Sequence, residues 1–147
     1  MKILALSGIL LILIISSSLG LMDPKRFGKK FAELIYKCHR SCKVITGVPQ
    51  QLIEGVKVGQ FPDNETDIQY YTLCLWASSG ELNDDYTLKK DQLVEYLAEM
   101  NITHQADIYE TCNKNAIKLV GLSLYKQIWE MQKCIYKNIP TEDFIFY

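Results

Sequence analysis

Four of the five cysteines in this chain of 147 residues lie far apart, in segments whose pattern is helical: Cys42, Cys74, Cys112 and Cys134. Cysteine pairs persist in oxidising compartments, so their meaning depends on where the protein folds. Closing a loop of about thirty residues contributes about 3–4 kcal/mol, which is a large fraction of the net stability of a small domain. Spacing alone allows several pairings of these cysteines.

The N-terminus has the features of a secretory signal peptide. Lys2 precedes a nearly continuous run of Leu and Ile over residues 3–15, which three serines and the small residue Gly20 follow. The alternative is a membrane anchor, but a spanning helix needs about 20 apolar residues. We therefore expect residues 1–20 to be cleaved, and residues 21–147 to form one secreted, extracellular domain that does not insert into a membrane.

The charge of the mature chain excludes one large class of function. The full chain has 16 basic and 17 acidic residues, and residues 1–20 hold one basic residue and no acid, so the net charge changes from −1 to −2 on cleavage. Nucleic-acid binding needs a basic surface, so we expect no such partner. No phosphate-binding loop, nucleophile elbow or zinc-protease motif is present, and we expect no catalytic site and no cofactor.

The hydrophobic periodicity predicts an all-α fold. Phe31, Leu34, Ile35, Cys38 and Cys42 recur every three or four residues, and charged residues fill the opposite face. No segment alternates with a period of two, so we expect no sheet. After this first helix, the pattern predicts helices over residues 49–56, 63–79, 88–100, 104–115 and 122–138.

Residues with capping preferences mark the ends of these predicted helices. Asp23 with Pro24 would begin the first helix, and Gly47 would end it in the left-handed conformation. The predicted N-caps of the third, fourth and fifth helices are Asp63 or Asn64, Thr87, and Thr103.

The cysteine spacing resembles that of insect odorant-binding proteins over nearly the whole mature chain. Members of that family carry six cysteines on a six-helix fold, with three residues between the second and third and eight between the fifth and sixth. If Cys42, Cys74, Cys112 and Cys134 match the first, third, fourth and sixth, then the second and fifth positions fall on Tyr70 and Tyr125. The segment from Cys42 to Val48 also resembles the family's segment after its first cysteine.

The resemblance implies which cysteines are bonded. The family pairs the first cysteine with the third, the second with the fifth and the fourth with the sixth. The expected disulfides are therefore Cys42–Cys74 and Cys112–Cys134. The two missing cysteines are partners of one another, as in the Minus-C subgroup, so we expect Tyr70 and Tyr125 to lie close together.

Cys38 is left without a family counterpart. We expect a buried free thiol that acts as a small hydrophobic residue. A bond from Cys38 to Cys74 in place of Cys42, or an intermolecular bridge, are the alternatives. Zinc binding by Cys38, His39 and Cys42 is disfavoured, because His39 points about 100° away from Cys38 on a helix and no fourth ligand is evident.

The resemblance also implies a function. It predicts a compact six-helix domain around an apolar cavity, in a secreted carrier that transports small hydrophobic molecules such as odorants or pheromones. A chemosensory receptor would be a further partner, and the protein would be a monomer or a weak homodimer. A secreted helical signalling protein of the cytokine type, with a solid core and a receptor-binding face, remains the alternative. The candidate ligand-binding residues are Ile68, Thr72, Leu75, Trp76, Leu93, Leu97, Leu124, Ile128, Trp129, Met131, Phe144 and Phe146.

The C-terminal residues 144–147 are all apolar or aromatic. Burying two such side chains contributes about 1.5–3 kcal/mol each, so we expect this tail to fold back and cover part of the cavity. We expect Glu142 or Asp143 to anchor it to a Lys or a His. Asn64 and Asn101 each begin an N-glycosylation sequon, and helix capping is the alternative role for both.

Overall fold

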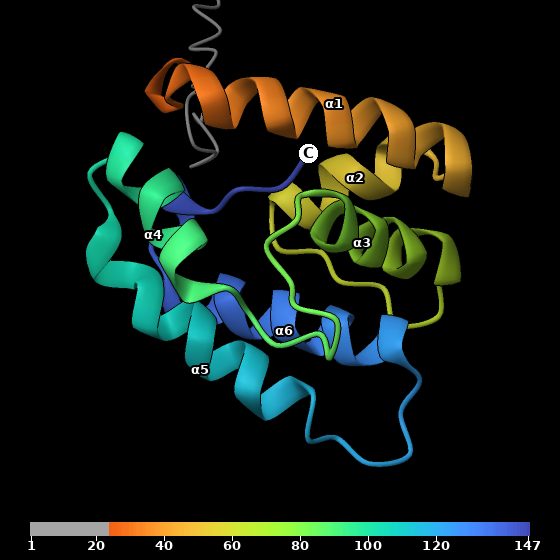
Figure 1. Ribbon diagram of the computed structural model, residues 1–147. Helices are drawn as coiled ribbons and strands as arrows, with labels where there is room; N and C mark the ends of the chain where they lie inside the picture. The colour runs from red at the N-terminus through yellow and green to blue at the C-terminus, as the bar shows by residue number, and fades with distance from the viewer. Residues whose placement is uncertain (1–23) are drawn as a thin grey trace, which may run out of the picture.

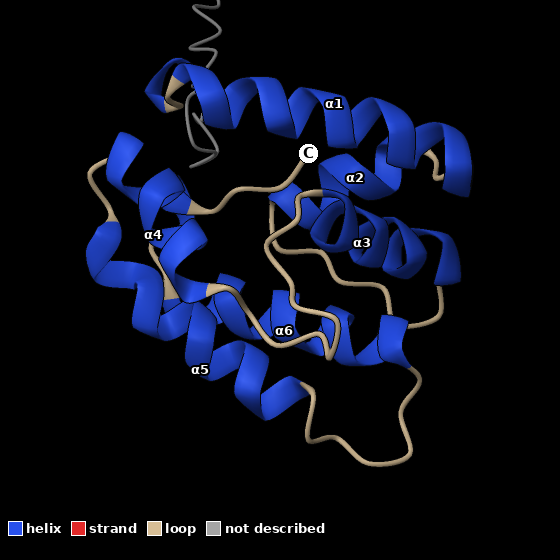
Figure 2. Ribbon diagram, viewed as in Figure 1, coloured by secondary structure: helices blue, strands red, loops and turns tan. Residues whose placement is uncertain are grey.

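The computed structural model describes residues 24–147, so the predicted signal peptide at 1–20 and the predicted cap Asp23 lie outside the described residues. Within residues 24–147 the chain forms α-helices and short 3-10 helices joined by loops, with no strand (Figures 1 and 2). The α-helices are α1 (Lys29–Thr46), α2 (Gln50–Lys57), α3 (Thr66–Ser78), α4 (Lys90–Glu99), α5 (Ala106–Ala116) and α6 (Leu124–Asn138). The all-α prediction is confirmed.

One of the two predicted ends of α1 agrees with the structure and the other does not. Gly47 has φ 67° and donates its N–H to the carbonyl of Lys43, as predicted for a left-handed C-cap. The N-terminal prediction was wrong, because Pro24–Arg26 forms a separate 3-10 helix. The α-helix itself begins at Lys29 after an extended Gly28.

The predicted starts of α3 and α4 were also too early, because tertiary contacts use the residues concerned. Asp63 does not cap α3, since its Oδ1 accepts hydrogen bonds from Trp129 Nε1 and Lys133 Nζ, both at 2.9 Å, and Glu65 is the N-cap. Leu88 precedes α4, because it pairs with Leu82 in an isolated antiparallel bridge. The N-cap of α4 is therefore Lys89 and not Thr87.

The last two α-helices also begin later than predicted. Thr103 opens a 3-10 helix, Thr103–Gln105, and α5 follows from Ala106. The predicted start of α6 at Leu122 was wrong, because Ser123 is extended and helical geometry begins at Leu124.

Two disulfides join pairs of packed helices. Cys42–Cys74 connects α1 to α3, and Cys112–Cys134 connects α5 to α6, each with 5.6 Å between the Cα atoms. α6 packs against both α3 and α5, while α1 packs against α3 on the other side (Figure 1). The bonded pairs are those that the family resemblance implied, and Cys38 is a buried free thiol, as expected.

Tyr70 and Tyr125 meet where a third disulfide would join α3 to α6. Their ring centroids are 4.3 Å apart and the ring planes are 32° from parallel. The expectation that these two residues are neighbours is confirmed. An aromatic pair of this kind contributes about 0.5–1.5 kcal/mol beyond its buried area.

Below α3, the interior is filled by one buried group that we call the packed core. Its members come from α3 and α6 and are at most 1% exposed: Ile68, Ile128, Trp129, Met131 and Ile135. Burial of this order contributes about 1.5–3 kcal/mol for each large apolar side chain.

Candidate functional site

A cavity of about 90 Å³ opens away from the packed core, between α1, the end of α3, α4 and the C-terminal tail. It is mostly apolar, with a few polar groups along one part of its wall. Its lining residues are Phe31, Leu34, Ile35, Cys38, Leu75, Trp76, Ser79, Glu81, Leu93, Leu97, Tyr109, Gln132, Ile145, Phe146 and Tyr147.

The α1 wall follows from helical spacing. Phe31, Leu34, Ile35 and Cys38 lie three or four residues apart, so they share one face of α1, and that face borders the cavity. This stripe is plain in the sequence as a buried face. Periodicity shows that this face of α1 is buried, but it does not show whether the face borders a cavity or a solidly packed core.

The C-terminal tail forms another wall. It runs back under α1 to the centre of the molecule (Figure 1), and Ile145, Phe146 and Tyr147 all line the cavity. Phe144 points elsewhere and packs edge-on against Tyr136, with 4.8 Å between ring centroids. Tyr71 Oη donates a hydrogen bond to the main-chain oxygen of Tyr147. The tail is therefore folded back onto the domain.

The tail's anchor differs in kind from the predicted one. Asp143 forms an ion pair with Arg26 at 3.1 Å and accepts a hydrogen bond of 2.6 Å from Gln105 Nε2. The prediction of a Lys or His partner was wrong, because the N-terminal 3-10 helix brings an arginine to this position. Glu142 remains exposed.

His39 stands at the end of the tail, outside the cavity lining. Its Nδ1 lies 2.7 Å from Tyr71 Oη, and burial lowers the pKa of this imidazole below its usual value. His39 is therefore mainly neutral at pH 7. His39 faces Tyr71 while Cys38 faces the cavity, and no cluster of three or more potential metal ligands occurs within residues 24–147.

The polar part of the cavity wall centres on Glu81, in the loop after α3. Its side chain is buried, with 6% of the residue exposed, and burial raises the pKa of its carboxyl to about 7. Burial, reinforced by the nearby Glu81 charge, also raises the pKa values of the Cys38 thiol and the Tyr109 hydroxyl. Both groups are therefore uncharged at neutral pH, and the Cys38 thiol is a poor nucleophile.

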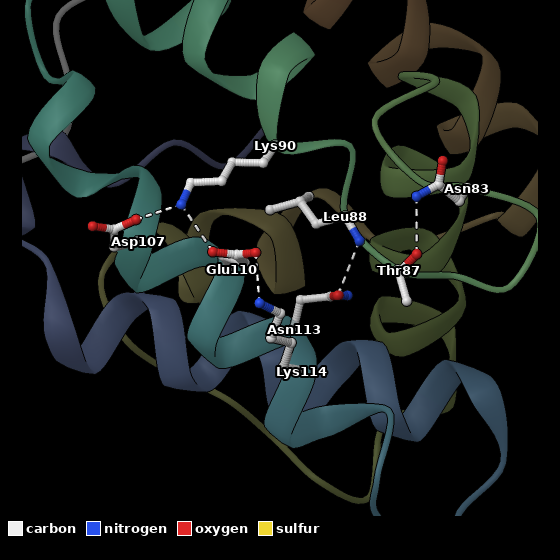
Figure 3. A network of polar contacts seen from close by, with 8 residues as sticks. All are labelled: Asn83, Thr87, Leu88, Lys90, Asp107, Glu110, Asn113 and Lys114. Atoms are coloured by element: carbon white, nitrogen blue, oxygen red, sulfur yellow. Dashed lines mark hydrogen bonds and ion pairs between the residues drawn. The ribbon is translucent and has the colours of Figure 1, made fainter.

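A polar network fixes the loop that carries Glu81 (Figure 3). Leu88 N donates to Asn113 Oδ1 at 3.0 Å, and Asn83 Nδ2 donates to Thr87 Oγ1 at 2.9 Å within the loop. At the start of α4, Lys90 bridges Asp107 and Glu110 of α5 at 2.5 and 2.9 Å. These contacts hold residues 81–90 against α5, so the position of Glu81 is set by the fold.

The structure divides the predicted ligand-binding residues into two groups. Leu75, Trp76, Leu93, Leu97 and Phe146 line the cavity. The others do not line it: Ile68, Thr72, Leu124, Ile128, Trp129, Met131 and Phe144.

The residues that miss the cavity do so for identifiable reasons. Thr72 is fully buried in α3 and its hydroxyl donates to the Ile68 carbonyl at 2.8 Å, so it offers no free group to a ligand. Ile128, Trp129 and Met131 belong to the packed core.

The sequence reasoning missed the α1 wall, Tyr109 and Gln132, and it missed Glu81. A glutamate after Gly80 in a polar loop has the signature of a solvent-exposed residue, so no sequence signal marks its burial.

The two sequons lie on the surface. Asn64 is exposed before α3 and Asn101 is exposed after α4, where it has φ 60°. Asn64 is not a cap of α3, but Asn101 follows the C-cap Met100 as the left-handed residue that ends α4, so the capping alternative holds for Asn101. Both side chains are therefore accessible to modification, and glycosylation at Asn64 and Asn101 stays a prediction.

A family model described as the PBP/GOBP family matches residues 24–138. No curated protein matches the chain, and no solved structure matches it. Within the described residues, every helix is too short or too polar to cross a membrane.

Proposed function

The chain belongs to the PBP/GOBP family, whose members are binding proteins, and on that premise we propose that it is a secreted carrier of small hydrophobic molecules such as odorants or pheromones. The observation that carries the proposal is the apolar cavity between α1, α3, α4 and the tail. Ligand sites of this kind are concave and mainly apolar, with a few placed polar groups.

The cavity volume limits what can bind without a structural change. An engineered apolar cavity of about 150 Å³ holds benzene, whereas this one encloses about 90 Å³. A molecule of four or five heavy atoms would therefore fit the present volume, and a longer ligand would require the wall to move. The tail is the wall segment with the fewest covalent constraints, since it is joined to the domain at one end.

We propose that the tail acts as a lid. Removing residues 145–147 keeps the Asp143–Arg26 anchor and Phe144 but deletes three lining residues. We expect an apolar fluorescent probe to dissociate at least about tenfold faster, because contacts worth about 1.4 kcal/mol or more are lost. Stopped-flow displacement measures the rate. Phe144→Leu, in the tail but outside the lining, is the matched control, and an unchanged off-rate after truncation would contradict the lid.

The alternative, a helical signalling protein with a solid core, predicts that no apolar probe binds. The cavity favours the carrier. Titration of the probe, followed by its displacement with short-chain alcohols and hydrocarbons, separates the two functions. Saturable binding that Leu97→Trp abolishes supports a carrier, since that substitution fills the cavity from α4. Absence of saturable binding would overturn the proposal.

We further propose that the carrier acts as a monomer or weak homodimer and delivers its ligand to a chemosensory receptor. These two points rest on the family alone.

A further inference from the structure

One acidic side chain, Glu81, is buried in the wall of this mainly apolar cavity. Glu81 is 6% exposed, and no ion pair among the described residues includes it. The cavity lining contains no Lys, Arg or His. A buried carboxylate without a cation or a full set of hydrogen bonds is strongly disfavoured, so the protein alone leaves this group unexplained.

The main chain of Glu81 is hydrogen-bonded on both sides, whereas its carboxyl has a hydroxyl and, within residues 24–147, no cation as a partner. Glu81 N donates to Ser79 Oγ at 3.3 Å, and its carbonyl accepts from Lys89 N at 2.7 Å. Among the described residues, the Ser79 hydroxyl is the side chain that hydrogen-bonds the carboxyl, and its single proton is shared with the carbonyl of Trp76 at 2.9 Å. Lys89 Nζ is bound to the Gly80 carbonyl at 3.0 Å and forms no ion pair with Glu81.

Two aromatic residues, Trp76 and Tyr109, line the cavity together with Glu81. They lie side by side, with ring centroids 6.4 Å apart. Trp76 Nε1 donates to Gln132 Oε1 at 2.8 Å, so these two polar groups already satisfy one another. A carboxylate beside aromatic faces is the combination that binds an ammonium group, through an ion pair and cation–π attraction.

We propose that the cavity selects small hydrophobic amines, with the ammonium group against the Glu81 carboxylate and the hydrocarbon part between α1, α4 and the tail. This inference rests on the proposed carrier function and specifies its ligand class. The amine would supply the cation and the hydrogen-bond donors that the protein does not provide.

The pH dependence of such binding has a defined sign. A bound cation favours the ionised form of Glu81, whose pKa in the free protein is about 7, so amine affinity should fall as the pH drops below that value. The other titratable side chains in the lining are Cys38 from α1, Tyr109 from α5 and Tyr147 from the tail, and burial raises the pKa of the first two, which therefore stay neutral over this range. α4 contributes only Leu93 and Leu97 to the lining, and the tail contributes residues 145–147.

The test uses three ligands of one shape. Isobutylamine, isobutanol and 2-methylbutane differ only in the head atom, and the amine is protonated at both pH 5.5 and pH 8. At pH 8 we expect displacement of the fluorescent probe by the amine at concentrations at least about tenfold lower than by either analogue. At pH 5.5 that preference should disappear.

Glu81→Gln should remove the preference for the amine at pH 8, while 2-methylbutane still displaces the probe. Glu95→Gln, an exposed acid on α4 outside the lining, is the control for the change in net charge and should behave as the native protein does. If Glu81→Gln does not fold, the pH profile of the native protein still decides the question.

The outcomes separate this inference from the proposed function. Binding of the probe and of 2-methylbutane without a preference for the amine would overturn amine selection and leave the carrier intact. A preference for isobutanol, or an amine preference that survives Glu81→Gln, would also overturn it. Failure of every ligand to bind would overturn both.

Discussion

Two regions of the interior differ in how they are filled. In the first, the packed core of Ile68 and four α6 side chains is at most 1% exposed. In the second, at the C-terminal end of α3, lining residues such as Leu34, Leu75 and Trp76 are only partly buried around a cavity of about 90 Å³. α6 packs along α3 and α5, and its side chains fill the packed core (Figure 1). The cavity lies between α1, the end of α3 and α4, and the C-terminal tail forms its remaining wall.

That difference shows why apolar stripes alone do not locate a ligand site. The apolar stripe of α6 contains large side chains, and they are packed solidly against neighbouring residues. The cavity is bounded instead by the ends of several elements and by a tail without regular structure. Stability and binding should therefore respond to different residues, and the two tryptophans provide a matched test.

Trp129→Ala should have the largest effect on stability. Trp129 is fully packed and donates Nε1 to Asp63, so we expect the free energy of unfolding to fall by about 3–5 kcal/mol. Trp76→Ala should cost clearly less, because Trp76 is partly buried beside existing empty space. Urea denaturation measures both. Trp76→Ala should instead change probe affinity, and equal stability losses for the two variants would contradict the distinction between the packed core and the cavity wall.

A third disulfide between α3 and α6 should raise the stability of the fold without altering the cavity. Tyr70→Cys with Tyr125→Cys places cysteines where the two rings now touch, and a bridge there should add about 2–4 kcal/mol. Neither tyrosine lines the cavity, so probe affinity should stay within about twofold of the native value. Thiol counting and thermal melting check the result, with Tyr70→Ala/Tyr125→Ala as the control. Two cysteines that stay reduced in a folded protein would show that the geometry does not permit a bridge.

Glu81 in the cavity wall should make the stability of the fold depend on pH, whereas the apolar packed core should not. Folding raises the pKa of Glu81 from 4.5 to about 7, which corresponds to at most about 3 kcal/mol. Its contribution is most favourable below pH 4.5 and is lost as the pH rises through about 7. Glu81→Gln should therefore raise the melting temperature at pH 8 and change it little at pH 4. Glu95→Gln should not do so, and parallel pH profiles for native and Glu81→Gln protein would contradict the burial of a titrating carboxyl.

Sequence reasoning recovered most of the fold and about half of the cavity wall. The helices follow from periodicity, and Gly47 ends α1 because a residue without a side chain adopts φ 67° freely. Helix starts were less accurate, since Asp63 and Leu88 take part in contacts to α6 and α5 that no local rule anticipates. Phe146 was expected at the cavity because it is apolar at a chain end, and it is found there.

The features that the sequence alone determined involve single helices or pairs of residues. The helical faces and the helix end at Gly47 can be inferred from residues read along the chain, and the two disulfides follow from the resemblance to odorant-binding proteins. Only the tertiary structure decided where space remains unfilled and that Glu81 faces it. Periodicity encodes which side of a helix is buried, but an unfilled volume depends on the joint shape of five or more elements, and the burial of a loop carboxyl depends on which helices pass over it.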